Sequence, residues 1–236
     1  MSNLETFETS APDPLVAKQP RLVCQEPAPS SAMLLAFPPN RATLGATAYL
    51  IVEEVNILVD CPAWNETNRA FLTAQGGVDW LFLTHRGGID SAKEIQQAFN
   101  CKVLIQEQEA YLLPGLAIAT FQQEFTLSTR SRAFWTCGHS PGSSCLYYQG
   151  LGGVLFSGRH LLPTPAGTIA PIRTAKTFHW PRQLQNVQRV IDQFSPETLR
   201  LICPGANLGF LRGRLAIDSA YEALLQLDQA QSDQTM

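Results

Sequence analysis

Short apolar runs, rich in β-branched and aromatic residues, alternate with amphipathic segments from Leu34 to about Leu227. Runs of this kind predict strands, and the amphipathic segments between them predict helices. Each half of this span has strands and then helices. We therefore expect an α/β (α+β) architecture, with two sheets covered by helices on their outer faces. Loops at the strand ends would carry any functional site.

The elements can be placed by their patterns. In the first half we expect a hairpin with strands at 47–53 and 56–60, a helix at 65–75, a strand at 79–84, a helix from about 92 to 99 and a strand at 102–106. In the second half we expect strands at 125–129, 132–137, 144–149, 153–157 and 199–203, a helix beginning at Pro181 and a helix at 215–227. Ser91 and Glu94 have the spacing of a capping box, which places the start of the helix near residue 92.

The chain divides into one domain and two tails. Residues 1–31 contain five prolines among polar residues, which predicts a flexible tail with one short strand at Arg21–Gln25. Partner binding by this tail is the alternative. Residues 32–228 form the predicted domain, and 229–236 are a polar C-terminal tail.

Composition excludes several function classes. The net charge of −3 gives no electrostatic footprint for nucleic acid, and no apolar run is long enough to span a membrane. The N-terminus lacks the apolar region of a signal peptide. The six cysteines contain no CxxC pair, so we expect reduced thiols in the cytoplasm, without disulfides or structural zinc. Only four histidines are present, which excludes a site built from five imidazoles.

Four stretches together carry a family resemblance: NILVDCPAW, LFLTHR, GHSPGSSCLYY and LFSG. Between Phe37 and Gly213 the chain resembles the metallo-β-lactamase superfamily, and within it a glyoxalase II-like branch of cyanobacteria and plants. The resemblance implies an αββα four-layer sandwich with a pair of zinc or iron ions held by loops at one edge. It also implies a hydrolase of thioesters or other esters, and a homodimer as one option for assembly.

The metal-binding motifs of that superfamily are only partly present. His85 matches the first histidine of the His-x-His-x-Asp-His motif, and His139 matches the histidine of the TPGHSPGS-like loop. Glycines stand where the branch has acids, Arg159 replaces the bridging aspartate, and alanine replaces the last histidine. Asp90 or Ser91 falls near the end of the first motif, and His160 lies one position past the third ligand position. The positions that depart from the motifs are Gly87, Gly88, Arg159 and Ala206.

The charge of Arg159 opposes metal binding at this place. Two unit charges about 4 Å apart repel by about 4 kcal/mol at an effective dielectric constant of about 20, and a divalent ion feels roughly twice that. We therefore expect no metal cofactor. If one zinc or iron ion is retained, its candidate ligands are His85, Asp90 and His139. The first hypothesis is thus a non-hydrolytic binding or interaction protein with an unknown protein partner, not an active hydrolase.

Two alternatives remain open. One is a metal-dependent hydrolase with a reduced, single-metal site. The other is a binder of small anions, in which Arg159, His139 and loop amides hold a carboxylate or phosphate. In each case we expect Arg159 to point into the former metal-site cleft, close to His85, His139 and Asp90.

Structural roles compete with these assignments. Asp90 or Ser91 could only cap the next helix, Arg159 could pair with Asp90, and His139 could be a structural imidazole bonded to turn amides. A surface or capping role fits His179. Cys137 and Cys145 could form a Cys–His catalytic pair, although nothing in the sequence lowers a thiol pKa. The GHSPGSS loop also contains three serines, which we interpret as turn residues: Ser140, Ser143 and Ser144.

Overall fold

The computed structural model describes residues 18–28 and 31–233. Its first sheet has seven strands in sequence order, with antiparallel pairing from β1 to β4 and parallel pairing from β4 to β7. The strands are β1 (Arg21–Gln25), β2 (Met33–Ala36), β3 (Tyr49–Val52), β4 (Ile57–Val59), β5 (Trp80–Phe82), β6 (Lys102–Gln106) and β7 (Ile118–Phe121).

The second sheet has five strands in the order β14-β11-β10-β9-β8, and only β11 and β14 are parallel in it. Its strands are β8 (Glu124–Ser128), β9 (Ser131–Trp135), β10 (Ser144–Tyr148), β11 (Val154–Gly158) and β14 (Leu201–Pro204). A two-stranded ribbon of β12 (Leu162–Pro163) and β13 (Ile169–Ala170) follows β11.

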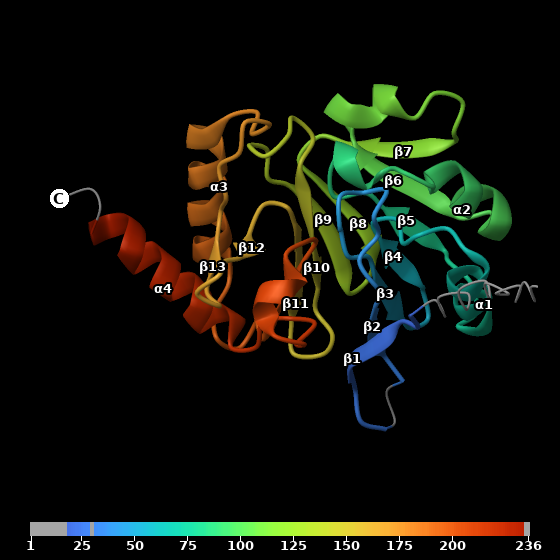
Figure 1. Cartoon of the computed structure of the whole chain (residues 1–236), viewed down its shortest axis with the longest axis horizontal. Helices are drawn as coiled ribbons and strands as arrows, with labels where there is room; N and C mark the ends of the chain where they lie inside the picture. Colours follow the sequence, from blue (N-terminus) through green and yellow to red (C-terminus); the bar gives the residue numbers. More distant parts are fainter. Residues whose placement is uncertain (1–17, 29–30, 234–236) are drawn as a thin grey trace, which may run out of the picture.

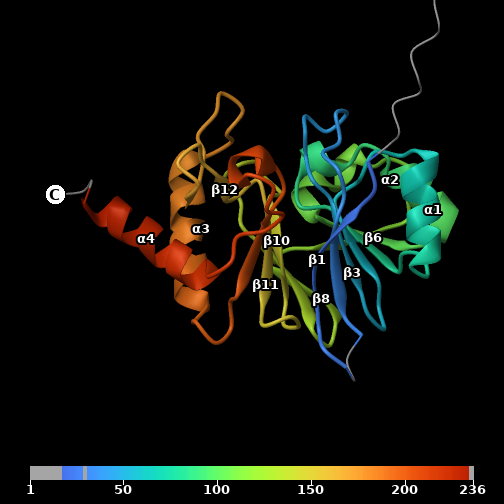
Figure 2. The same ribbon diagram turned by 60° about the horizontal axis from the view of Figure 1, so that its bottom comes forward.

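Helices cover the outer face of each sheet, so the molecule has four layers (Figures 1 and 2). The helices α1 (Glu66–Ala74) and α2 (Ala92–Phe99) lie on the seven-stranded sheet. The helices α3 (Trp180–Gln193) and α4 (Ala220–Asp233) lie on the five-stranded sheet. Short 3-10 helices occupy Arg86–Gly88, Glu107–Leu112 and Leu208–Leu211.

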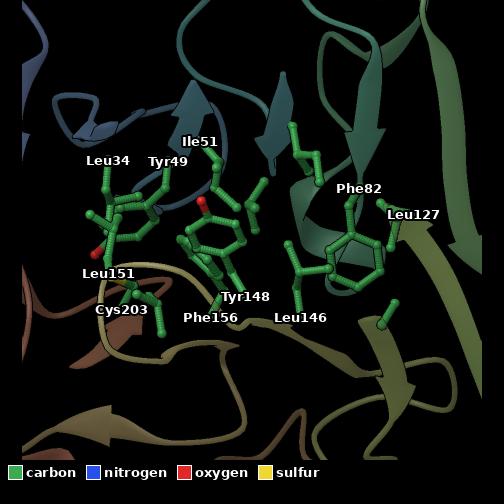
Figure 3. Packing of buried hydrophobic residues seen from close by; sticks show 14 of the residues in the cluster. Leu34, Tyr49, Ile51, Phe82, Leu127, Leu146, Tyr148, Leu151, Phe156 and Cys203 are labelled. Atoms are coloured by element: carbon green, nitrogen blue, oxygen red, sulfur yellow. The ribbon is translucent and has the colours of Figure 1, made fainter. Parts of the chain in front are cut away.

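Alternation along each strand explains the layering. In β3, Tyr49 and Ile51 face the other sheet, whereas Leu50 faces the helices α1 and α2. The side chains between the two sheets form the central core, where Tyr49 packs edge-on against Phe156 at 5.6 Å between ring centroids (Figure 3). A strand buried on both faces has no polar side, which is why the central strands have nearly continuous apolar sequences.

The expected αββα four-layer sandwich is confirmed, with some differences at the ends of elements. The strand predicted at Arg21–Gln25 forms and pairs with β2, so it joins the first sheet as its edge. The last helix begins at Ala220 instead of 215 and runs to Asp233. The predicted capping box is wrong, because Ser91 makes no side-chain capping bond and its hydroxyl donates to Asp90 Oδ2 at 3.2 Å.

Both sheets bring the carboxyl ends of key strands to one edge of the sandwich. The amide of Ser144 donates to the carbonyl of Thr84 at 2.8 Å, which joins the loop after β5 to the start of β10. The amide of Gly205 donates to the carbonyl of Gly158 at 2.7 Å, which joins the ends of β14 and β11. Within the described ranges, no helix is long and apolar enough to cross a membrane.

Candidate functional site

A pocket of about 680 Å³ lies at this edge, between the loops that follow β5, β9 and β11. Four of the five residues singled out in the sequence line it: His85, Asp90, His139 and Arg159. His160 does not line it. The other lining residues are Ala42, Thr43, Leu44, Arg86, Gly87, Ile89, Thr174, Ala175 and Lys176.

A buried carboxylate holds His85 in place through the hydroxyl of Thr84. Asp60 Oδ1 accepts from the Thr84 amide at 2.8 Å, and Oδ2 accepts from the Thr84 hydroxyl at 2.7 Å. The same hydroxyl lies 3.0 Å from His85 Nδ1. Burial raises the pKa of Asp60 to about 6, although its hydrogen bonds with Thr84 and the charge of Arg159 act in the opposite direction. Asp60 is therefore mainly ionised at pH 7.

This arrangement requires a glycine at position 158. Gly158 has a φ of +52°, and a Cβ there would lie 2.6 Å from Thr84 Oγ1. Such contacts are sterically forbidden, and the left-handed backbone disfavours side chains in any case. The glycine that ends β11 thus allows the second sheet to approach the Asp60–Thr84–His85 chain closely.

The rings of His85 and His139 form an edge-on pair with centroids 5.4 Å apart. Burial, the neighbouring His139 and the charge of Arg159 hold the pKa of His85 well below its usual value. Burial and the charges of Arg159 and Arg86 lower the pKa of His139 to about 4. Both rings are therefore neutral at pH 7, because burial and the nearby cations disfavour the protonated form of an imidazole.

Arg159 lines the pocket but does not form the ion pair with Asp90 that the sequence suggested. Its Nη2 donates to the carbonyl of Thr43 at 3.1 Å, and it belongs to none of the ion pairs among the described residues. Asp90 is exposed and accepts from Asn40 Nδ2 at 3.4 Å as well as from Ser91. Asp60 is the acid whose charge acts on Arg159.

His160 is buried away from the pocket. Its carbonyl accepts from Gln183 Nε2 of α3 at 3.1 Å, and burial is the main cause that lowers its pKa to about 4. His160 follows the third ligand position in a turn that its own amide closes by donating to the carbonyl of Ser157 at 2.9 Å, and this turn places it against α3.

The residues at this edge do not fit the metal pair that the resemblance implies. In the part of the chain that the structure describes, no group of three or more His, Cys, Asp or Glu side chains could hold a metal ion. The acids of the first motif are excluded sterically as well. A Cβ on Gly88 would lie 2.5 Å from Asp60 Oδ1, and one on Gly87 would lie 2.8 Å from His85 Nε2.

The remaining candidates have structural positions. His179 caps α3 by accepting from the amide of Arg182 at 3.2 Å. Burial raises the pKa of Cys145 to about 12, which argues against a thiolate nucleophile. The hydroxyls of Ser140 and Ser143 lie 2.9 Å apart inside their own turn.

Three residues of this site were missed in the sequence: Asp60, Arg86 and Lys176. Asp60 ends a strand inside the NILVDCPAW stretch, and its left-handed φ of 59° marks a special position. Only that strand-end placement could have indicated it. Lys176 lies in a loop far along the chain from the motifs, so no local pattern connects it with them.

The comparisons agree with this architecture. No protein-family model and no curated protein matches the sequence. Among solved structures, the chain is similar to the DIM-1 metallo-β-lactamase exposed to ceftazidime, with a TM-score of 0.65, 13% identity and coverage of 91% of this chain and 98% of that one. It is also similar to TTHA1623 in a di-iron-bound form, with a TM-score of 0.60, 20% identity and coverage of 79% and 96%.

A third similar structure is ST1585 from Sulfolobus tokodaii, an archaeal metallo-β-lactamase superfamily protein. Its TM-score is 0.57, at 14% identity, over 90% of this chain and 86% of that chain. Identities this low establish the fold and not the activity. The chain therefore has the metallo-β-lactamase fold.

Proposed function

We propose that this protein binds a small anionic ligand in the pocket around Arg159 and does not catalyse metal-dependent hydrolysis. One observation carries the proposal: the described lining of the pocket contains three cations, Arg86, Arg159 and Lys176, against the single carboxylate of Asp90. The likeness of the motifs to the glyoxalase II-like branch supports descent from a hydrolase.

Charge at the base of the pocket favours an anion over a metal ion. Arg159 is half-buried, and a buried cation is stable only with an acid or a bound anion beside it. The buried carboxylate of Asp60 supplies part of the negative charge that stabilises Arg159. The two histidines are neutral at pH 7, so the guanidinium of Arg159 is the charged group at the base of the pocket that an anion would pair with.

Calorimetric titration with phenylacetate and with inorganic phosphate at low ionic strength tests this proposal. We expect at least one of them to bind, and Arg159→Gln to weaken that binding by about tenfold or more, the effect of losing a charge-assisted hydrogen bond. Arg132→Gln is the matched control, because Arg132 pairs with Glu124 at 2.8 Å outside the pocket. The proposal would be contradicted if neither anion binds, or if Arg159→Gln binds them with the same affinity as Arg132→Gln.

The cytoplasmic location and a homodimer remain predictions. So does a protein partner in place of a small anion. A protein partner bound at this pocket would compete with the titrated anion, which makes the same assay informative about it.

A further inference from the structure

Two buried polar atoms at the pocket have no hydrogen-bond partner in the described part of the chain. They are Nε2 of His85 and Nε of Arg159. The other buried atoms without partners belong to residues outside the pocket lining. Because buried polar groups are nearly always paired in folded proteins, these two indicate what a bound molecule supplies.

The hydrogen bonds of Thr84 fix the role of His85. The Thr84 hydroxyl has one hydrogen, and it donates that hydrogen to Oδ2 of Asp60, 2.7 Å away. Toward His85 Nδ1, at 3.0 Å, the hydroxyl can only accept. The proton of the neutral imidazole is therefore on Nδ1, and Nε2 carries a lone pair. His85 needs a donor at Nε2.

Arg159, in contrast, lacks a hydrogen-bond acceptor for one of its donors. Its Nη2 donates to the Thr43 carbonyl, but its Nε–H has no acceptor. A guanidinium edge in a site with excess positive charge prefers an anionic oxygen. The pocket thus presents one unpaired donor with positive charge and one unpaired acceptor.

Resting on the proposed function, we infer that the ligand is an organic oxyanion that carries a hydroxyl or amide hydrogen beside its charged group. The oxyanion takes the Nε–H of Arg159, and the adjacent hydrogen is donated to Nε2 of His85. The apolar side chains of Leu44 and Ile89 line the same pocket of about 680 Å³, which is larger than an inorganic ion needs. An apolar substituent on the ligand fills this space.

Access to His85 runs past Gly87. Nε2 of His85 and Nε of Arg159 are both covered in this structure, so side chains at the pocket must shift for a ligand to reach them, and the Cβ position of Gly87 lies 2.8 Å from Nε2. A small displacement of the Gly87–Gly88 backbone opens this atom to the ligand, and glycines allow that displacement at low steric cost. A side chain at 87 would block the same path.

Mandelate and phenylacetate form a matched pair of probes, because they differ only in the hydroxyl beside the carboxylate. We expect calorimetry at pH 7 to show that mandelate binds about tenfold more tightly, the effect of one hydrogen bond to a buried acceptor. Arg159→Gln should weaken both probes, whereas His85→Phe should remove only the difference between them. Equal affinities in the wild-type protein overturn the inference but leave the anion pocket intact. Binding of neither probe, or binding that ignores Arg159, overturns the proposed function instead.

A measurement on the unaltered protein avoids dependence on the folding of the His85 variant. The ¹⁵N resonances of His85 should show a protonated Nδ1 and an unprotonated Nε2 in the free protein. Saturating mandelate should shift the Nε2 resonance upfield, as hydrogen bonding to a lone pair does, and phenylacetate should leave it near its free value. A free protein with the proton on Nε2 overturns the inference.

Discussion

The single hydroxyl hydrogen of Thr84 decides which nitrogen of His85 carries a proton. Asp60 receives that hydrogen together with the amide of Thr84. The backbone of Gly158 approaches this hydroxyl so closely that a Cβ at position 158 would lie 2.6 Å from Thr84 Oγ1. The chemistry of the pocket therefore depends on residues that do not line it.

Replacing Gly158 by alanine tests this dependence. A Cβ at 2.6 Å from Thr84 Oγ1, on a backbone with φ of +52°, should lower the free energy of unfolding by about 2–4 kcal/mol. Gly167→Ala is the matched control, because Gly167 also has a positive φ, +80°, but nothing within 4 Å of its Cβ position. Urea unfolding compares the two. Equal losses would show that backbone conformation alone, and not the contact with Thr84, determines the effect.

At the residue scale, the sequence indicates the position of a residue where a motif directly follows a strand with a clear apolar pattern. His85, His139 and Arg159 follow strands whose apolar patterns are clear, and they line one pocket. The Asp90–Arg159 ion pair was wrong because loop geometry, which turns Asp90 toward Asn40, is not encoded in spacing. Arg86 lies in a single 3-10 turn and Lys176 in an irregular loop, and neither is long enough for a periodic pattern to predict where its side chain points.

The elements themselves are held together at the end of the sandwich opposite the pocket. Arg130, in the turn between β8 and β9, donates to the carboxylates of Glu26 and Glu53, the former at 2.6 Å, and lies over the ring of Tyr148. Glu26 also accepts from the amide of Leu151 at 2.8 Å. One guanidinium thus joins the ends of strands from both sheets.

We expect Arg130→Gln to lower the free energy of unfolding by about 1–3 kcal/mol, because two partly buried carboxylates lose their shared partner. The Arg130 side chain is 34% exposed, so solvent screening keeps the loss below that of a fully buried pair. Arg69→Gln serves as the control. Its pair with Glu66 is exposed within one helix, where such pairs contribute less than about 1 kcal/mol. Denaturant unfolding in which both variants lose the same amount would contradict this role.

Element prediction succeeded where periodicity was strong. The helix α1 begins directly after its predicted cap Asn65, α3 begins at Trp180, one residue before the predicted Pro181, and the central strands have the expected positions. The start of α4 was placed five residues early, because the apolar residues from 215 to 217 pack as an extended segment bridged to Ile202. Strand β7 has a weak alternation and forms only through its parallel pairing with β6.

At the scale of the whole molecule, buried imidazoles make stability depend on pH. His160 has a pKa of about 4 in the folded protein against a usual 6.5, so between these values the unfolded chain binds a proton that the folded protein does not. Stability therefore falls as pH decreases through that range. His85 and His139 act in the same direction. Asp60, with its pKa raised to about 6, acts in the opposite direction. Because three histidines oppose this single carboxyl group, we expect the net stability to fall at acidic pH.

The urea midpoint should thus be lower at pH 5 than at pH 7. His160→Gln should reduce this difference, whereas His179→Gln, at an exposed helix cap, should retain it. A midpoint that is unchanged or higher at pH 5 would show that the imidazoles are not held neutral. The sequence could not predict this effect, since burial of a histidine beside a motif arises only from packing against α3.

The four-layer architecture was predictable because the strands that carry the motifs and the amphipathic helices between them both indicate the same fold. The similar solved structures have this fold as well. At the edge of this fold, the guanidinium of Arg159 lies in a pocket that two neutral imidazoles also line. The central claim is that this cation has taken the place of the metal pair.

Elemental analysis of tag-free protein, purified without chelator, tests that claim most directly. With Arg159 in the pocket and no metal-ligand group of three in the described residues, we predict less than one transition-metal ion per chain. Arg159→Asp should raise the content slightly, because the repulsion is removed while the missing histidines still limit affinity. Two stoichiometric metal ions per wild-type chain would contradict the account.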